Sequence, residues 1–176
     1  MLFRSLLRGR KNLEEALKLL NEVTKRDPDF APAWTNIALI YGVYSSYTTN
    51  EEQLANYKQW NTQGKNAAQK ALTLDPDSAE AHAALSRIVF SESEYIESFK
   101  QSDRALVLSP NNPVILDLIS QNSLEVGYFQ YAKQLSINAI AIDPLVAMYR
   151  ITLGRIYIRL GENEKAIANL EKGIER

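Results

Sequence analysis

The chain carries few residues that could perform covalent or acid–base chemistry. His82 is its only histidine and it has no cysteine, which excludes disulfides, thiol catalysis and cysteine-ligated metal sites. A single histidine without cysteine does not make a usual zinc site. In a pattern that repeats along the chain, His82 takes the place that Trp34 holds earlier, and this place faces a core. We therefore expect His82 to pack, and not to act as a base or a ligand.

One group of carboxylates lies in the segment SESEYIES, residues 91–98. Glu92, Glu94 and Glu97 could share general acid and base roles, but acidic residues are also favoured at the start of a helix. We favour the second interpretation, a solvated helix start. The seven glycines are scattered and form no phosphate-binding loop, and no nucleophile can be paired with a base. The sequence therefore predicts a chain that is not an enzyme and that holds no cofactor or metal.

Composition excludes further classes of protein. The 176 residues are 45% hydrophobic, enough for a sizeable core, and 20 basic against 21 acidic residues leave no basic footprint for nucleic acid. No apolar run approaches the ~18 residues that span a bilayer. Arginines interrupt the opening MLFRSLLRGRK, which makes a poor signal peptide. We expect a cytoplasmic protein without membrane insertion, and the lack of cysteine is equally compatible with a bacterial periplasm.

The elements that position these residues follow a fixed period. Pro76, Pro110 and Pro144 are 34 residues apart, and Pro28 precedes Pro76 by 48, which is one period plus 14. A fixed period of this size is typical of stacked repeats. It predicts one array over 1–176, divided into a partial unit 1–30, a unit 31–78 with a 14-residue insertion, units 79–112 and 113–146, and a partial unit 147–176.

Each unit is predicted to hold two helices joined by a short turn. In the run AWTNIALIYGVY, residues 33–44, the spacing i, i+3, i+4 and i+7 places four residues on one helix face: Trp34, Ile37, Ala38 and Tyr41. Gly161 and, one period earlier, Gly127 suit the left-handed end of a helix, while Asn112 followed by Pro113 is typical of a helix start. Small residues mark where the helices of a unit should cross closely: Ala38, Ser86, Ser120 and Gly154 in first helices, and Ala16, Gly64, Ser98, Ala132 and Ala166 in second helices.

This pattern resembles the tetratricopeptide repeat (TPR) family, whose signature is Trp, Leu-Gly and Tyr in the first helix and Ala, a large residue and Pro in the second. The signature is clearest in WTNIALIY, residues 34–41, and in LGRIY, residues 153–157. The resemblance covers essentially the whole chain. It implies an all-α fold, a right-handed superhelix of about ten antiparallel paired helices, and a concave groove that binds a protein or peptide partner.

The residues of this groove follow from their place in each unit. The fifth, ninth and twelfth residues of each first helix lie opposite the stripe that meets the second helix, so they should face the concave side. Long polar side chains at the ninth place then lie beside apolar ones at the twelfth, which suits a carboxylate next to a hydrophobic anchor. The alternative is that the apolar residues only fill space between first helices. The candidate residues are Thr35, Leu39, Arg87, Phe90, Asp117, Gln121, Leu124, Ile151, Arg155 and Ile158.

The 14 extra residues lie between Tyr41 and Gly64 and predict one long helix over 51–74, with Asn50 as its N-cap. At 1.5 Å per residue this helix is about 36 Å long, so it should project beyond its neighbours. The aromatic residues in and beside this insertion either form a platform for a partner or pack together to hold the hairpin. We favour packing, because large exposed apolar patches are uncommon. These residues are Tyr44, Tyr47, Tyr57 and Trp60.

A narrower resemblance rests on residues 6–47, LLRGRKNLEEALKLLNEVTKRDPDFAPAWTNIALIYGVYSSY, and residues 70–85, KALTLDPDSAEAHAAL. They are similar to bacterial TPR arrays that lie C-terminal to a nucleotide-cyclase or winged-helix DNA-binding domain. That similarity implies a fragment that serves as the regulatory or self-association arm of a larger signalling protein. Both chain ends present apolar faces to no further helix, so we also expect a homodimer.

Overall fold

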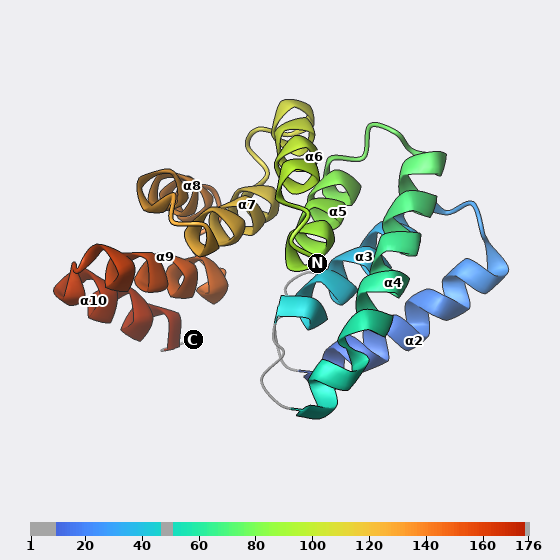
Figure 1. The fold of residues 1–176 in the computed structure, drawn as a ribbon, viewed down its shortest axis with the longest axis horizontal. Helices are drawn as coiled ribbons and strands as arrows, with labels where there is room; N and C mark the ends of the chain where they lie inside the picture. The colour runs from blue at the N-terminus through green and yellow to red at the C-terminus, as the bar shows by residue number, and fades with distance from the viewer. Residues whose placement is uncertain (1–9, 47–50, 175–176) are drawn as a thin grey trace. The chain divides into compact units, whose positions relative to one another are not determined.

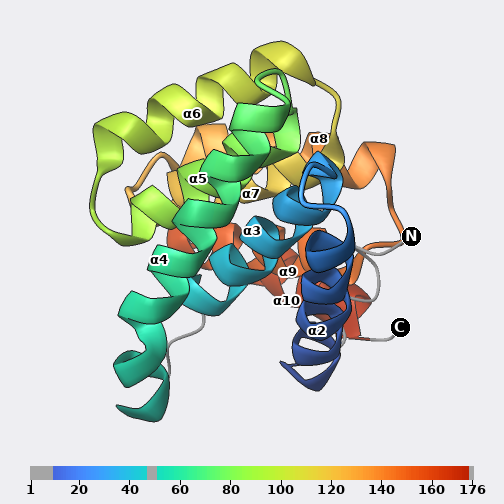
Figure 2. The same cartoon turned by 90° about the vertical axis from the view of Figure 1, so that its right-hand side faces the viewer.

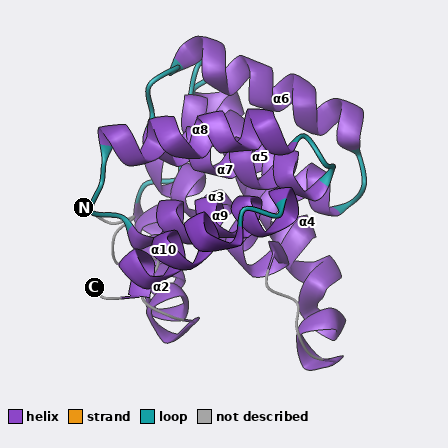
Figure 3. Ribbon diagram, turned by 90° about the vertical axis from the view of Figure 1, so that its left-hand side faces the viewer, coloured by secondary structure: helices purple, strands orange, loops and turns teal. Residues whose placement is uncertain are grey.

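The structure, a computed structural model, describes residues 10–46 and 51–174. These ranges contain helices and short turns and no strand (Figure 1 and Figure 3), which confirms the predicted all-α class. None of the described helices has both the length and the apolar character that crossing a bilayer requires. Of the ten expected helices, nine lie in the described ranges: α2 Arg10–Arg26, α3 Ala31–Ser46, α4 Glu51–Leu74, α5 Ala79–Ser91, α6 Tyr95–Leu108, α7 Pro113–Glu125, α8 Phe129–Ile142, α9 Ala147–Leu160 and α10 Asn163–Ile174.

The helices fall into two compact units, Met1–Leu108 and Ser109–Arg176. In the first unit α3 pairs with α4 and α5 pairs with α6, while α5 also contacts both helices of the preceding pair. In the second unit α7 pairs with α8 and α9 with α10, and α9 packs against α8. These pairs are the ones that the 34-residue period predicts. A single continuous array over 1–176 stays a prediction.

Close helix crossings occur at two of the predicted small residues. A Cβ added to Gly154 of α9 would lie 2.7 Å from Cγ of Leu170 in α10. A Cβ added to Gly64 of α4 would lie 2.8 Å from Cβ of Tyr41 in α3. Distances this short are repulsive, so only glycine lets the two helices of each pair approach as they do.

Buried serines take the place of these small residues in two other pairs. The Ser86 hydroxyl of α5 lies 2.7 Å from the Ser102 hydroxyl and 3.1 Å from the Ser98 hydroxyl, both in α6. Ser120 of α7 donates a 2.8 Å hydrogen bond to the backbone carbonyl of Ala132 in α8. Buried hydroxyls need such partners, and here each helix pair supplies them from its own two helices.

The turns that join the two helices of a unit have a repeated backbone conformation. Gly127 and Gly161 both have positive φ, 89° and 76°, as their position predicts. Ser93 has φ 65° and lies one period before Gly127. At the start of α7, the Asn112 side chain accepts hydrogen bonds from the backbone N–H groups two and three residues on, and Pro113 occupies the first turn. The predicted cap is confirmed.

The insertion forms the predicted helix, because α4 spans Glu51–Leu74. It has 24 residues against 16 in α3, and its first turns extend past the end of α3 (Figure 2). Its predicted cap at Asn50 and the ring of Tyr47 lie outside the described residues. The Tyr44 ring lies 5.2 Å from the Trp60 ring, centroid to centroid, and 6.2 Å from the Tyr41 ring. These rings pack on one another, which favours the packing interpretation.

Candidate functional site

His82, the residue best suited to acid–base chemistry, is held by structural hydrogen bonds. Its Nε2 lies 3.1 Å from the backbone carbonyl of Pro76, and its Nδ1 lies 2.5 Å from Oε1 of Gln101. One unit earlier, Nε1 of Trp34 donates a 2.8 Å hydrogen bond to the carbonyl of Pro28. Both rings thus contact the turn that precedes their helix, as expected of packing residues.

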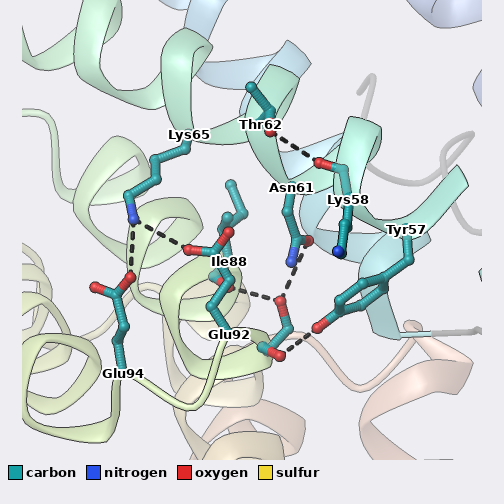
Figure 4. Close-up of polar contacts among 9 residues, drawn as sticks. Tyr57, Lys58, Asn61, Thr62, Lys65, Ile88, Glu92 and Glu94 are labelled. Atoms are coloured by element: carbon teal, nitrogen blue, oxygen red, sulfur yellow. Dashed lines mark hydrogen bonds and ion pairs between the residues drawn. The ribbon is translucent and has the colours of Figure 1, made fainter.

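The carboxylates before α6 form ion pairs (Figure 4). Lys65 Nζ of α4 lies 3.0 Å from a carboxylate oxygen of Glu92 and 3.0 Å from one of Glu94. Hydrogen bonds to these two carboxylates raise the pKa of Lys65. Nearby, the Tyr57 hydroxyl donates to the backbone carbonyl of Ser91. These contacts bind the long helix to the α5–α6 turn, and they give the acidic residues a structural use that does not involve catalysis.

No group of three or more histidine, cysteine, aspartate or glutamate residues within the described ranges could hold a metal ion. The functional candidates are therefore the predicted groove residues. Four of them lie in the first unit, on α3 and α5, and the other six lie in the second unit, on α7 and α9.

In the first unit, α3 contributes little surface and α5 contributes more. Thr35 and Leu39 of α3 are 7% and 6% exposed, and the Thr35 hydroxyl donates to the backbone carbonyl four residues earlier. Arg87 and Phe90 of α5 are half-buried. The Phe90 ring meets the Tyr95 ring edge-on, with centroids 5.2 Å apart. Arg87 and Phe90 are thus the accessible candidates of this unit.

In the second unit, three candidates are engaged with their own helices or with α10. Asp117 is 5% exposed and accepts a 2.8 Å hydrogen bond from the side-chain amide of Gln121, one turn further along α7. Ile151 lies against Gly173 of α10, since a Cβ on that glycine would be 3.1 Å from Ile151 Cγ1. These contacts lie inside the second unit.

The other three candidates of the second unit lie together. Leu124 of α7 and Arg155 and Ile158 of α9 line one pocket of about 220 Å³, which Glu125 and Arg159 complete. Leu124 is 4% exposed and packs with Ala132 and Ile156 in the core, whereas Ile158 is 53% exposed. The pocket therefore has an apolar base in the core and an apolar side chain at its open rim.

The two arginines of the pocket have different surroundings. Nη2 of Arg155 donates a 2.8 Å hydrogen bond to Oε1 of Glu125, and both side chains are 47% exposed. The guanidinium of Arg159 lies over the Phe129 ring, 5.5 Å from its centroid. Among the residues that the structure describes, Arg159 forms no ion pair. The pocket thus carries two positive charges and one negative charge.

Sequence reasoning did not find Glu125 or Arg159. The predicted groove consists of the fifth, ninth and twelfth places of each first helix, and these two residues stand at the thirteenth. One signal was present, because Arg159 follows Arg155 by four residues, and side chains four apart on a helix are neighbours.

Comparison with known proteins gives two sequence matches. A family model described as tetratricopeptide repeat matches residues 149–176. The TPR repeat-containing thioredoxin TTL4 of Arabidopsis thaliana is 32% identical over 120 residues, which is 66% of this chain. The chain covers 17% of that plant protein's length.

The solved structures that share the fold include two described as TPR proteins. TTC0263, described as a thermophilic TPR protein of Thermus thermophilus, has a TM-score of 0.74 at 16% identity, over 94% of this chain and 83% of that one. YrrB, described as a TPR protein with an unusual peptide-binding site, has a TM-score of 0.57 at 20% identity, over 98% and 82% of the two chains. At these identities the likeness concerns the fold alone.

Proposed function

Since the chain belongs to the tetratricopeptide repeat family, we propose that it is an interaction scaffold, not an enzyme, which binds a peptide segment of a partner along its first helices. The observation that carries this proposal is the pocket between α7 and α9. It is lined by three of the residues that the repeat pattern assigns to the groove: Leu124, Arg155 and Ile158.

The size and lining of the pocket favour a peptide side chain over a cofactor. Pockets for small molecules usually measure about 300–1,000 Å³, and this one measures about 220 Å³. Its guanidinium groups present hydrogen-bond donors in a fixed planar fork that matches a carboxylate. Its apolar residues offer a contact for an adjoining hydrophobic side chain. Peptide recognition commonly combines these two kinds of contact.

Arg87 and Phe90 of α5 repeat the same pairing in the first unit, a guanidinium three residues before an apolar side chain. We propose them as a separate contact point within the first unit. YrrB is described as having a peptide-binding site, which supports the proposal only as an example of such a site on this fold.

Selection from a random peptide-display library on the immobilised chain tests this function. The selected peptides should lose affinity by at least about tenfold when Arg87 and Arg155 are both replaced by alanine, because a hydrogen bond to a charged group contributes about 1.5–3 kcal/mol. Lys172→Ala, which removes one charge from exposed α10 surface, is a control for the loss of surface charge. An unchanged affinity in the double variant would place the binding surface elsewhere.

A second candidate function is self-association, as an arm of a larger signalling protein. Ile167 and Ile174 of α10 are 56% and 77% exposed. One period earlier the same places on α8 hold Lys133 and Ile140, which are both half-buried, and α8 is the helix that α9 packs against. A second copy of the chain could cover α10 in the same way. Sedimentation over a wide concentration range should then show a dimer, and a strict monomer at high concentration would reject this candidate.

A further inference from the structure

The side chains at the mouth of the pocket define what a partner would meet there. Glu125 is the last residue of α7, and its carboxylate forms an ion pair with the guanidinium of Arg155 on α9. Arg159 lies one helical turn further along α9, stacked on Phe129. One arginine of the pocket therefore already holds a carboxylate, and the other presents its donors without one among the described residues.

The arrangement points to a ligand with one negative charge. The two arginines and Glu125 sum to a net charge of +1, which one carboxylate neutralises. A phosphate group, with a charge of about −1.5 to −2 near neutral pH, exceeds that balance. Leu124 and Ile158 provide apolar contact beside the arginines, so the charged group should adjoin an aliphatic side chain.

We propose that the pocket binds a peptide segment in which an acidic residue adjoins a large aliphatic residue, and that Glu125 is a built-in competitor for the acidic group. The incoming carboxylate binds between Arg155 and Arg159, and the aliphatic side chain lies on Leu124 and Ile158. The Glu125 carboxylate must yield part of its contact with Arg155 when the segment binds. This inference rests on the proposed peptide-binding function and names its ligand.

The exposure of the Glu125–Arg155 pair makes this exchange feasible. Both side chains are 47% exposed, and exposed ion pairs contribute little stability because water solvates both charges after they separate. The Glu125 carboxylate can therefore give up part of its contact with Arg155 at small cost while it stays at the mouth of the pocket. The pair also holds the Arg155 guanidinium beside the pocket in the free protein, where a carboxylate of the partner can take over the same donors.

The test uses the 176-residue chain, labelled with ¹⁵N, and short capped peptides with a Gly-Ser background. The reference peptide contains Leu-Glu at its centre, and the comparison peptides contain Leu-Gln, Leu-Lys, Gly-Glu or Leu-phosphoserine. Arginine Nε–Hε resonances report on the pocket, and the indole resonances of Trp34 and Trp60 report on the first unit. Spectra of each variant confirm that it is folded.

We expect the Leu-Glu peptide to shift the Arg155 and Arg159 resonances and to bind more tightly than the other four. Arg159→Ala should weaken its binding, and Glu125→Gln should strengthen it, each by about twofold to fivefold, the range that an exposed ion pair supports. Lys172→Ala, on exposed α10 surface, should leave binding unchanged.

The outcomes separate this inference from the function on which it rests. If Glu125→Gln weakens binding or leaves it unchanged, Glu125 is no competitor. Preference for the Leu-Lys peptide would make Glu125 the recognition group, and preference for phosphoserine would reject a single carboxylate. If none of these peptides shifts the pocket arginines, the pocket assignment is wrong. In each case peptides selected by display could still bind the chain, so the proposed function would fail only if that selection failed too.

Discussion

The left-handed residue in the α5–α6 turn can be changed to the residue that the other two turns use. Ser93 has φ 65°, and the residues at the same place in the next two units are Gly127 and Gly161, with φ 89° and 76°. The following residue in each turn donates its backbone N–H over 2.9 Å to a carbonyl in the preceding helix. The three turns thus have one geometry, and only the first builds it without glycine. Ser93→Gly should therefore stabilise the chain.

The size of this effect follows from two opposing terms. A left-handed conformation costs a residue with a Cβ about 1–2 kcal/mol, and Ser93→Gly removes that cost. Glycine also loses more backbone entropy on folding than serine does, and this loss reduces the gain in stability by about 0.5–1 kcal/mol. The net expectation is a free energy of unfolding that rises by about 0.5–1 kcal/mol. Ser93→Ala keeps the Cβ and the strain, so it should change stability little and is the matched control.

Urea unfolding followed by tryptophan fluorescence measures this prediction. Trp34 and Trp60, the two tryptophans of the chain, lie in the same compact unit as Ser93. With a slope of about 2 kcal/mol per molar urea, the midpoint should rise by about 0.3–0.5 M. The reverse change, Gly161→Ser, should destabilise the second unit by a similar amount, measured by circular dichroism. A midpoint that falls in Ser93→Gly, or rises equally in Ser93→Ala, would refute the reasoning.

Two further predictions concern packing and charge. Gly154→Ala should lower the free energy of unfolding by about 1–3 kcal/mol, because its new Cβ would lie 2.7 Å from a side-chain carbon of α10. In Gly42→Ala the new Cβ would have its nearest neighbour at 3.5 Å, so the free energy of unfolding should stay unchanged or rise by up to about 1 kcal/mol. Thermal melts in which Gly42→Ala is the less stable of the two variants would contradict the close crossing at Gly154. Lys65 has a raised pKa in the folded state, so its ion pairs stabilise fully below its ordinary pKa of 10.5 and are lost as pH rises through the raised value. Lys65→Met should cost less than about 1 kcal/mol near pH 8, and a loss in urea midpoint that persists above the raised pKa would exclude the ion pairs as its cause.

Features that repeat or depend on nearby residues could be predicted from the sequence. The long α4 helix has its predicted bounds because the helix period acts over a few residues. Gly127 and Gly161 have the predicted left-handed conformation because their positions recur. The crossing at Gly154 follows from the small residues that recur at its place. Ser93 escaped notice, because serine does not signal a positive φ by its type.

The pocket could be predicted only in part. Periodicity assigned Leu124, Arg155 and Ile158 to one surface, because it fixes the direction in which each side chain leaves its helix. It could not show that Arg155 pairs with Glu125, or that Arg159 stacks on an aromatic ring, because those contacts depend on rotamers and on the spacing of three helices. The ion pairs of Lys65 with Glu92 and Glu94, which lie 27 and 29 positions further along the chain, likewise depend on rotamers and helix spacing.

The most direct test of the central claim is photo-crosslinking of a display-selected peptide to the chain. A benzophenone amino acid replaces Ile158 at the rim of the pocket in one variant and Ile137 of α8 in the other. These residues are 53% and 39% exposed, and α8 does not line the pocket. The account predicts a strong peptide adduct at position 158 and little at position 137. An adduct at position 137 alone, or equal yields at both, would contradict binding at the pocket.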